Sequence, residues 1–351
     1  MGRLTRAQAQ EQNRERVLAA ARQEFAERGF RDAKIDLIAE RAELTRGAVY
    51  SNFPGKRALY FAVLAAEAER MPATPEPGCT PRAALGAFAR AWLARLPLTT
   101  DHDDGSARLG ADLMPEVAAD GRTRLPYAQL MALGALLLGL ALERLDPGAR
   151  RVRAAQAALT TLQGASQLAA AAPGFVDPFD VVSACEQLAE LDLGDTHAPP
   201  HLPFAPQARP VDGTWTPPAA VDALRGEPVD LRGDGVVAVL GLHRLTAVEE
   251  AVRAAPGAEV TAVLVSGEPA ELVPLARLVV ADLCRCLRQA FPAAAWPRLR
   301  VVHDERGAVA AAAGEPAVSD ATEAAVRIAG GRIVARAEGR GACNAVARLG
   351  G

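Results

Sequence analysis

The sequence predicts a multidomain protein in which an all-α N-terminal part is followed by an α/β part. Apolar residues recur at helical spacing over most of residues 12–191. After a proline-rich stretch, short apolar runs typical of buried strands alternate with helical patterns in residues 219–351. A chain of 351 residues is long enough to form two or three hydrophobic cores.

Composition and cysteine usage favour a cytoplasmic protein. Charged residues make up 23% of the chain. Its most apolar run, residues 136–142, is closed by Glu143, so we expect a buried helix and no membrane span. The first six residues are polar and basic, unlike a secretion signal. Five scattered cysteines, an odd number, are typical of a reducing compartment rather than of a disulfide framework.

Positive charge is concentrated at the N-terminus. Residues 1–57 contain 12 Lys and Arg against 8 Asp and Glu, a local net charge of +4, although the whole chain carries −3. The rest of the chain is therefore acidic. A basic end on an acidic body attracts polyanions to that end. Charge alone would favour a solvated helix face without a partner, but its coincidence with a helix-turn-helix pattern favours a nucleic-acid partner.

Residues 1–72 predict four helices, of which the second and third form a helix-turn-helix. We expect them at 12–28, 33–42, 45–53 and 56–70. Asp32 is expected to cap the second and Thr45 the third, which Pro54 must end. Gly47 and Ala48 are small and allow the third helix to approach base edges closely, while Arg46 can reach a guanine edge with two hydrogen bonds.

The aromatic residues of this segment have alternative roles. Phe53 is expected in the core. The Tyr50 ring can pack against the protein while its hydroxyl group reaches outward.

The spacing of these residues resembles the DNA-binding domain of the TetR family of bacterial repressors. The matching positions are Phe25, Gly29, Phe30, Ile38, Ala39, Ala42, Leu44, Thr45, Gly47, Tyr50, Phe53, Lys56 and Leu59. The resemblance implies that Thr45, Arg46, Gly47 and Ala48 face bases or the nearest phosphates, and that Tyr50, Lys56 and Lys34 contact phosphates. The full expected set for double-stranded DNA is Lys34, Thr45, Arg46, Gly47, Ala48, Tyr50, Ser51, Asn52 and Lys56.

Two positions depart from the family pattern. Glu43 stands where the turn usually has glycine, which costs about 1 kcal/mol if the backbone there has a positive φ. Lys34 stands where a small hydroxyl residue is common, so its phosphate contact can differ in kind.

Residues 80–192 predict a helical domain for ligand binding and dimerisation. Helices are expected at 81–96, 106–118, 124–144, 149–171 and 178–191. The family resemblance implies a homodimer through the last two long helices, 130–145 and 152–168. The alternative is that these helices pack only within the core of their own domain. It also implies an inducer pocket for an unknown small molecule. The expected lining is Trp92, Leu109, Met114, Tyr127 and Met131, which could equally be plain core.

The C-terminal part follows a stretch, residues 195–218, whose seven prolines predict a semi-rigid linker. Residues 219–351 predict strands at 236–240, 260–265 and 299–302, a hairpin of 324–328 with 332–337, and helices at 246–254, 268–291 and 342–349. This order resembles the thioredoxin-like fold, in its redoxin branch, through residues 302–305 and 330–334.

The thiol chemistry of such a fold is missing from the expected positions. Residues 241–246, after the first strand, contain no cysteine, and residues 319–323, before the hairpin, contain no proline. Cys284 and Cys286 fall two apart within a predicted helix and cannot readily bridge. We therefore expect a module without enzymatic activity.

The resulting functional hypothesis is a homodimeric, ligand-responsive DNA-binding regulator, with repression the favoured action and no metal or cofactor. The alternative is a redox-linked enzyme or partner-docking protein whose main activity lies in the C-terminal domain.

Overall fold

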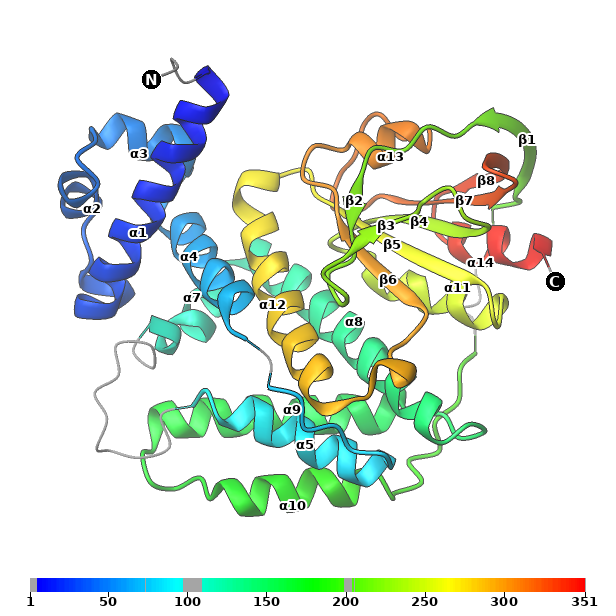
Figure 1. Cartoon of the computed structure of the whole chain (residues 1–351), viewed down its shortest axis with the longest axis horizontal. Coiled ribbons are helices and arrows are strands. Elements are labelled where there is room, and N and C mark those ends of the chain that lie inside the picture. The colour runs from blue at the N-terminus through cyan, green and yellow to red at the C-terminus, as the bar shows by residue number, and fades with distance from the viewer. Residues whose placement is uncertain (1–4, 73, 97–108, 199–203, 205, 351) are drawn as a thin grey trace.

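The computed structural model describes residues 5–72, 74–96, 109–198, 204 and 206–350. Three parts can be distinguished: a small helical head (residues 5–70), a helical body (residues 81–188) and an α/β region (residues 209–350). The head lies at one end of the molecule, and the α/β region packs along the body (Figure 1).

The head contains the four helices predicted from the sequence: α1 (Arg6–Asp32), α2 (Ile35–Arg41), α3 (Arg46–Asn52) and α4 (Lys56–Arg70). Thr5 and Gln8 form a reciprocal capping box at the start of α1. The expected Asp32 cap is wrong, because Asp32 ends the short helical segment that follows a kink at Gly29 (φ +72°), and Lys34 occupies the N-cap of α2 without a side-chain cap bond. Thr45 does cap α3, as predicted.

An apolar grid holds the head together. Phe25, Ile38, Val49, Phe53 and Leu59 are all buried in one cluster, so each of the four helices contributes to one core. The Phe25 ring meets the Tyr60 ring edge-on, with ring centroids 5.3 Å apart. Phe25 lies on α1 and Tyr60 on α4, so this aromatic contact joins the first helix to the helix that leads into the body.

The body contains α5 (Pro81–Leu93), α7 (Leu113–Ala119), α8 (Gly121–Leu145), α9 (Val152–Ala171) and α10 (Pro178–Leu188). Residues 106–108 of the expected helix at 106–118 lie outside the described residues. Among the helices described, α8 is long and apolar enough to span a membrane by length and composition. A helix in a protein interior passes the same test, and 61% of the apolar window of α8 is buried.

The α/β region is built on a mixed sheet with strand order β1-β8-β7-β4-β5-β6. Its strands are β1 (Arg209–Thr214), β4 (Gly235–Gly241), β5 (Glu259–Val265), β6 (Leu299–His303), β7 (Glu323–Ala329) and β8 (Arg332–Glu338). β4, β5 and β6 are parallel, whereas β7, β8 and β1 pair antiparallel. β2 (Ala220–Val221) and β3 (Pro228–Val229) form a separate small hairpin.

Helices cover both faces of the large sheet. They are α11 (Val248–Ala254), α12 (Pro269–Ala290), α13 (Ala308–Ala312) and α14 (Ala342–Ala347). α11, α12 and α14 contribute to the larger core cluster, together with Val236 and Ala238 of β4. α13 contributes Val309 to a second cluster on the opposite face, where Val237 and Val239 of β4 point.

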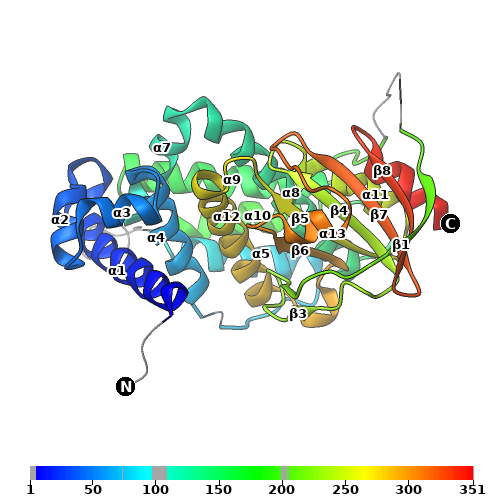
Figure 2. The ribbon, with the colours of Figure 1, turned by 90° about the horizontal axis from the view of Figure 1, so that it is seen from above.

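The structure differs from the predicted linker in two ways. Residues 209–214, expected within it, form the edge strand β1, where proline is tolerated because the outer side of an edge strand needs no ladder bond. The α/β region is also not held by a tether alone. α12 lies between the sheet and the helices α4, α5 and α8 (Figure 2), and one hydrophobic core runs through both parts.

Candidate nucleic-acid interface

The turn between α2 and α3 sets the direction of α3. Glu43 has a φ of +50°, which is the left-handed conformation. The sequence analysis attached an energetic cost to a residue other than glycine in this conformation. Its side chain compensates through an ion pair with Arg16 of α1, with 2.9 Å between Nη2 and Oε2. Two residues later, the Thr45 hydroxyl accepts a hydrogen bond from the Ala48 amide at 3.2 Å and fixes the start of α3.

The outward face of α3 carries Arg46, Gly47 and Tyr50. The Arg46 side chain is 62% exposed, and Tyr50 is 41% exposed. At Gly47, an added Cβ would meet only the Thr45 hydroxyl at 3.8 Å, so the backbone here is open to close approach. An exposed guanidinium can bond a guanine edge in a major groove, and the absent side chain at Gly47 leaves room for close approach.

Arg46 is partnered within the head. Its guanidinium lies 3.3 Å from a carboxylate oxygen of Asp36 on α2 and 5.6 Å from the centre of the Tyr50 ring. A hydrogen bond with Tyr50 and the charge of Asp36 raise the pKa of Arg46 above its ordinary value. The side chain is therefore held charged over α3 and is paired with Asp36 in the free protein.

The last two residues of the expected set turn toward the helix itself. Ser51 Oγ and Asn52 Nδ2 both donate to the Ala48 carbonyl, at 2.9 and 2.8 Å. Ser51 is exposed and Asn52 is half-buried. Their polar groups stabilise α3 in the free protein.

The two expected lysines differ in environment. Lys34 is exposed at the start of α2. Lys56 is half-buried at the start of α4, where Nζ donates to the Arg31 carbonyl at 3.0 Å and lies 4.7 Å from the centre of the Phe30 ring. Burial lowers the pKa of Lys56 from its ordinary value. Lys56 thus fastens α4 to the end of α1, a role that the sequence did not indicate.

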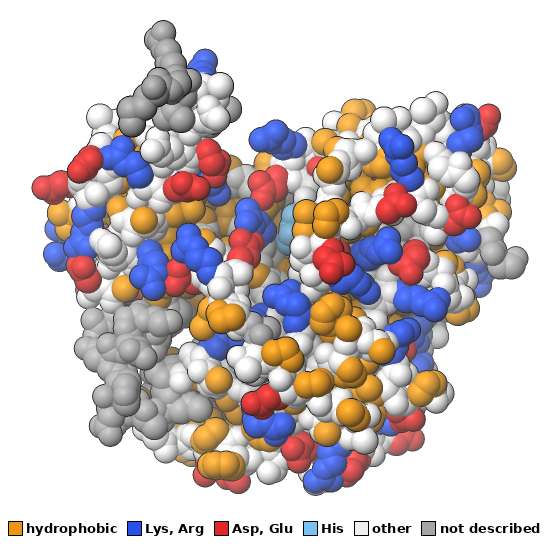
Figure 3. Space-filling model, viewed as in Figure 1, with side chains coloured by type: hydrophobic (Ala, Val, Ile, Leu, Met, Phe, Trp, Pro, Cys, Tyr) orange, Lys and Arg blue, Asp and Glu red, His pale blue; other side chains and the backbone are white. Residues whose placement is uncertain are grey.

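A buried carboxylate beneath the interface was also missed by the sequence analysis. Glu24 of α1 is fully buried and lies 3.2 Å from Arg28 and 3.3 Å from Arg41. The i,i+4 spacing of Glu24 and Arg28 was a visible signal for one half of this cluster. The Arg41 contact ties α1 to α2 and depends on tertiary structure. On the face of the molecule in Figure 3, basic and acidic side chains are interspersed over the head.

The residues predicted to line an inducer pocket fall into two groups. Trp92 Nε1 donates to Ser166 of α9 at 3.0 Å, and Gln163, one turn earlier, donates to the Tyr127 hydroxyl at 2.8 Å. Gln163 also lies 3.8 Å from the sulfur of Met131. Burial raises the pKa of Tyr127 to about 12, so its hydroxyl group stays protonated.

The second group lies beside α4. The Leu109 carbonyl accepts a hydrogen bond from the Tyr60 hydroxyl at 2.5 Å, and Met114 is half-buried on α7. These two residues are therefore placed at the junction between the body and the head.

In the α/β region, residues 241–246, at and after the end of β4, contain no cysteine, and the structure places an ion pair at this strand end. Arg244, after β4, bonds the buried Glu323 of β7, with Nε and Oε2 3.0 Å apart. Cys284 and Cys286 are free and buried, and burial raises both of their pKa values, that of Cys284 to about 12. Thiols held protonated in this way are poor nucleophiles.

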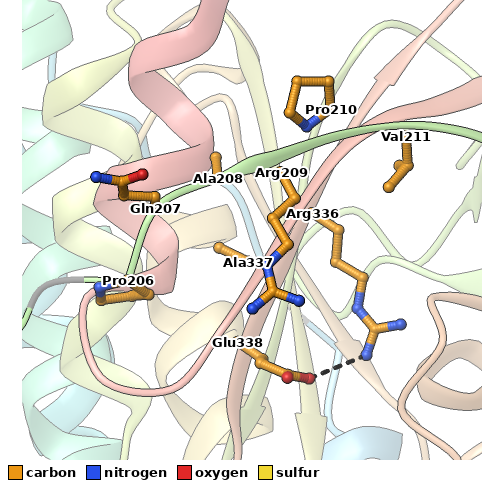
Figure 4. Close-up of a pocket in the computed structure, with 9 residues that line it drawn as sticks. All are labelled: Pro206, Gln207, Ala208, Arg209, Pro210, Val211, Arg336, Ala337 and Glu338. Atoms are coloured by element: carbon orange, nitrogen blue, oxygen red, sulfur yellow. Dashed lines mark hydrogen bonds and ion pairs between the residues drawn. The ribbon is translucent and has the colours of Figure 1, made fainter.

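A pocket of about 680 Å³ lies along the edge strand β1. Figure 4 shows that Arg209 and Arg336 both extend into it near Glu338. Arg336 already pairs with Glu338 at 3.2 Å and with Glu315 at 2.6 Å. Its positive charge is therefore neutralised within the protein.

Comparison with known proteins decides the identity of the head. The profile of the family described as "Bacterial regulatory proteins, tetR family" matches residues 17–63. The head is a TetR-family domain. The HTH-type transcriptional regulator SrpR of Pseudomonas putida is 48% identical over 65 residues, which are 18% of this chain and 30% of SrpR. TtgW, another HTH-type transcriptional regulator of Pseudomonas putida, is also 48% identical over 65 residues, which are 18% of this chain and 48% of TtgW.

This chain thus spans about a third to a half of the length of the curated relatives. Solved structures match over a longer stretch but at low similarity. A TetR transcriptional regulator from Rhodococcus sp. RHA1 has a TM-score of 0.35 and 19% identity over 52% of this chain and 95% of its own. NalD, the secondary repressor of the MexAB-OprM multidrug efflux pump in Pseudomonas aeruginosa, has a TM-score of 0.33 and 22% identity over 52% of this chain and 96% of its own.

Proposed function

We propose that this protein is a DNA-binding transcriptional regulator whose TetR-family domain inserts α3 into the major groove. The observation that carries the proposal is the outward face of α3, where exposed Arg46 stands beside the open backbone of Gly47 within the matched residues. Lys34, Thr45 and Tyr50 would flank this face as phosphate contacts.

Binding to fragments of the source genome tests this function. We expect the purified full chain to shift a small number of fragments, with an affinity that falls steeply as salt is raised. A protein that shifts no fragment at low ionic strength would not be a DNA-binding regulator.

We also infer a homodimer that reads a palindromic operator, because one head covers only a short site. The sequence analysis assigned the interface to residues 130–145 and 152–168, but α12 covers much of α8 in the structure. α9 and α10 are the better pair. Leu168, Phe175 and Phe179 lie on them or between them and are 42%, 72% and 81% exposed, which is costly unless a second copy covers them.

Light scattering tests this interface. The wild-type chain is expected to have the mass of a dimer, and Phe179→Asp that of a monomer. Leu349→Asp, at the exposed C-terminal end of the α/β region, is the matched control and should stay dimeric. A Phe179→Asp variant that remains a dimer would place the interface elsewhere.

Repression in the cytoplasm, relieved by a small molecule in the body, is the mode of action we propose. In support, Trp92 bonds Ser166, and Tyr127 bonds Gln163 one turn earlier on α9, so polar groups of the predicted lining lie close together within the helical body. An operator–reporter fusion in cells is expected to be silent with the protein and active without it.

We propose that the α/β region is a thioredoxin-like module without thiol chemistry. The strand order and the hairpin β7–β8 agree with that fold, whereas the Arg244–Glu323 pair occupies the strand end where a reactive thiol would be needed. A thiol-reductase assay on the full chain tests the redox alternative, since the region shares its core with the body. Activity above that of a variant lacking all five cysteines would support the enzyme.

A further inference from the structure

One arginine of α12 is buried without a matching carboxylate. Arg285 is 4% exposed and points toward α5. Its Nη2 reaches the Ala91 carbonyl only at 3.5 Å and the Cys286 sulfur at 3.6 Å. Nε has no hydrogen-bond partner. Nη2 thus makes one long contact with a carbonyl and one weak contact with a thiol, and Nε makes none.

The charges around Arg285 do not balance. Asp282, one turn earlier on α12, is paired with Arg95, which follows the C-terminal end of α5. The Asp282 carboxylate is therefore already engaged by another guanidinium. Within the described ranges, no carboxylate oxygen lies within 4.0 Å of Arg285. Burial lowers the pKa of Arg285 from its ordinary value, which reflects the cost of a charge that has left water.

A buried charge without a partner is expensive, and such a group in a folded protein calls for an explanation. Buried apolar side chains adjoin this contact along both helices: Ala91, whose carbonyl Arg285 approaches, and Trp92 on α5, and Leu283 on α12. Trp92 already lies over Arg95, with 4.7 Å between the guanidinium carbon and the ring centre. An anionic head with an apolar tail matches this combination.

We propose that Arg285 is the anion-binding residue of an effector site at the contact between α5 and α12, and that its ligand is a monocarboxylate with an apolar body. The carboxylate would accept hydrogen bonds from Nε and Nη2 of Arg285, supplying the missing negative charge. The proposal deepens the proposed function, because it names the class of the inducer. It also makes the α/β region part of the inducer site.

The same helix reaches the head. Glu271, at the start of α12, bonds Arg57 of α4 at 2.7 Å, and Arg277 bonds Glu69 of α4. An anion bound at Arg285 therefore acts on the helix that holds α4. Any shift of α12 on binding changes the position of the TetR-family domain without a separate relay.

The thermal unfolding midpoint of the full chain tests the site with octanoate as the probe and octanamide as its uncharged control. We expect octanoate to raise Tm by at least about 2 °C, and octanamide or sodium chloride at equal ionic strength to leave it unchanged. Acetate distinguishes the site from a general anion effect, since it lacks the apolar body. No rise with octanoate, or an equal rise with octanamide or acetate, overturns the proposal.

Two variants separate a ligand role from a structural one. Arg285→Leu removes the unpaired charge, so without ligand we expect Tm to stay the same or rise by about 2–4 °C, and the octanoate response to vanish. Arg288→Leu is the matched control on the same helix. Arg288 donates to the Ala223 and Leu224 carbonyls at 3.2 and 2.9 Å, so its loss should lower Tm and leave the octanoate response intact.

If Arg285→Leu lowers Tm as Arg288→Leu does, Arg285 is a structural residue and the proposal is overturned. An octanoate response that survives in Arg285→Leu overturns it as well. These measurements contain no DNA. A failure here is therefore distinguishable from a failure of DNA binding.

Discussion

Arg277 of α12 holds Glu69 of α4 through two hydrogen bonds, with Nε–Oε1 and Nη2–Oε2 distances of 2.8 and 2.7 Å. The pair joins the α/β region directly to the last turns of α4. Two parallel bonds between a guanidinium and a carboxylate fix orientation as well as distance. The position of the head is thus set by a region that lies more than 200 residues away in the sequence.

A double-mutant cycle on this pair measures the coupling. Both side chains are more than a third exposed, so we expect Arg277→Met and Glu69→Gln each to cost about 0.5–1 kcal/mol in unfolding free energy. The double variant should cost less than the sum of the two. Strict additivity in urea unfolding would mean that the pair contributes nothing.

Glu43 offers a test of backbone strain in the turn before α3. Its φ of +50° favours glycine, whereas its side chain holds Arg16. Glu43→Ala removes the ion pair and keeps the strain, so it should destabilise the protein. Glu43→Gly removes both, and we expect it to be more stable than Glu43→Ala by about 1 kcal/mol in thermal unfolding. Equal stability of the two variants would contradict a strained turn.

The elements that the sequence predicted are those with strong local signals. The Thr45 cap, the strands around Val237 and Val263, and the hairpin across Gly330 each rest on a few neighbouring residues, and the structure contains all of them. The helices that carry the expected DNA-facing set were likewise visible from spacing alone.

The features that the sequence did not predict depend on distant contacts. β1 was hidden by its proline content and becomes a strand only because β8 pairs with it. The Arg46–Asp36 and Glu24–Arg41 contacts join different helices, and no pattern in the sequence pairs them. The position of α12 against α4 likewise follows from packing between elements far apart in the chain.

His303 predicts a pH dependence of stability. Burial, and then the charge of Arg277, lower its pKa from 6.5 to about 4, with Glu69 opposing them. The unfolded chain takes up a proton near pH 6.5, while the folded protein takes one up only near pH 4. The stabilising contribution is therefore complete above pH 6.5 and is lost as pH falls toward 4, by up to about 3 kcal/mol.

Urea unfolding of wild type and His303→Gln at pH 7.0, 5.5 and 4.5 isolates this group from the carboxylates. We expect the difference in unfolding free energy between the two proteins to change steadily from pH 7.0 to 4.5, because wild type loses more stability on acidification. A constant difference would show that His303 takes up its proton equally in both states.

Lys56 is expected to affect DNA binding and stability together. Lys56→Met should weaken binding to all sequences alike and reduce the salt dependence by about one unit, if Nζ contacts a phosphate. It also removes the bond to the Arg31 carbonyl, so we expect a loss of about 1–2 kcal/mol in unfolding free energy. Lys34→Met is the matched control, and should change the salt dependence without the stability loss. If the salt dependence of DNA binding is unchanged in Lys56→Met, Lys56 is a structural residue and not a phosphate contact.

Arg46 and Asp36 test the reading surface itself. Arg46→Ala should weaken binding to the operator about 10- to 100-fold and relax the preference at one base pair, because a guanidinium that bonds a guanine edge is lost. Asp36→Asn should strengthen binding about two- to five-fold, since it frees Arg46 and removes a negative charge near the phosphates. In the Arg46→Ala background, the part of the gain from Asp36→Asn that depends on Arg46 disappears.

Arg82 is an exposed arginine of α5, and the control variant Arg82→Ala should bind DNA as wild type does. If Arg46→Ala also binds as wild type by fluorescence anisotropy, α3 does not read bases through Arg46.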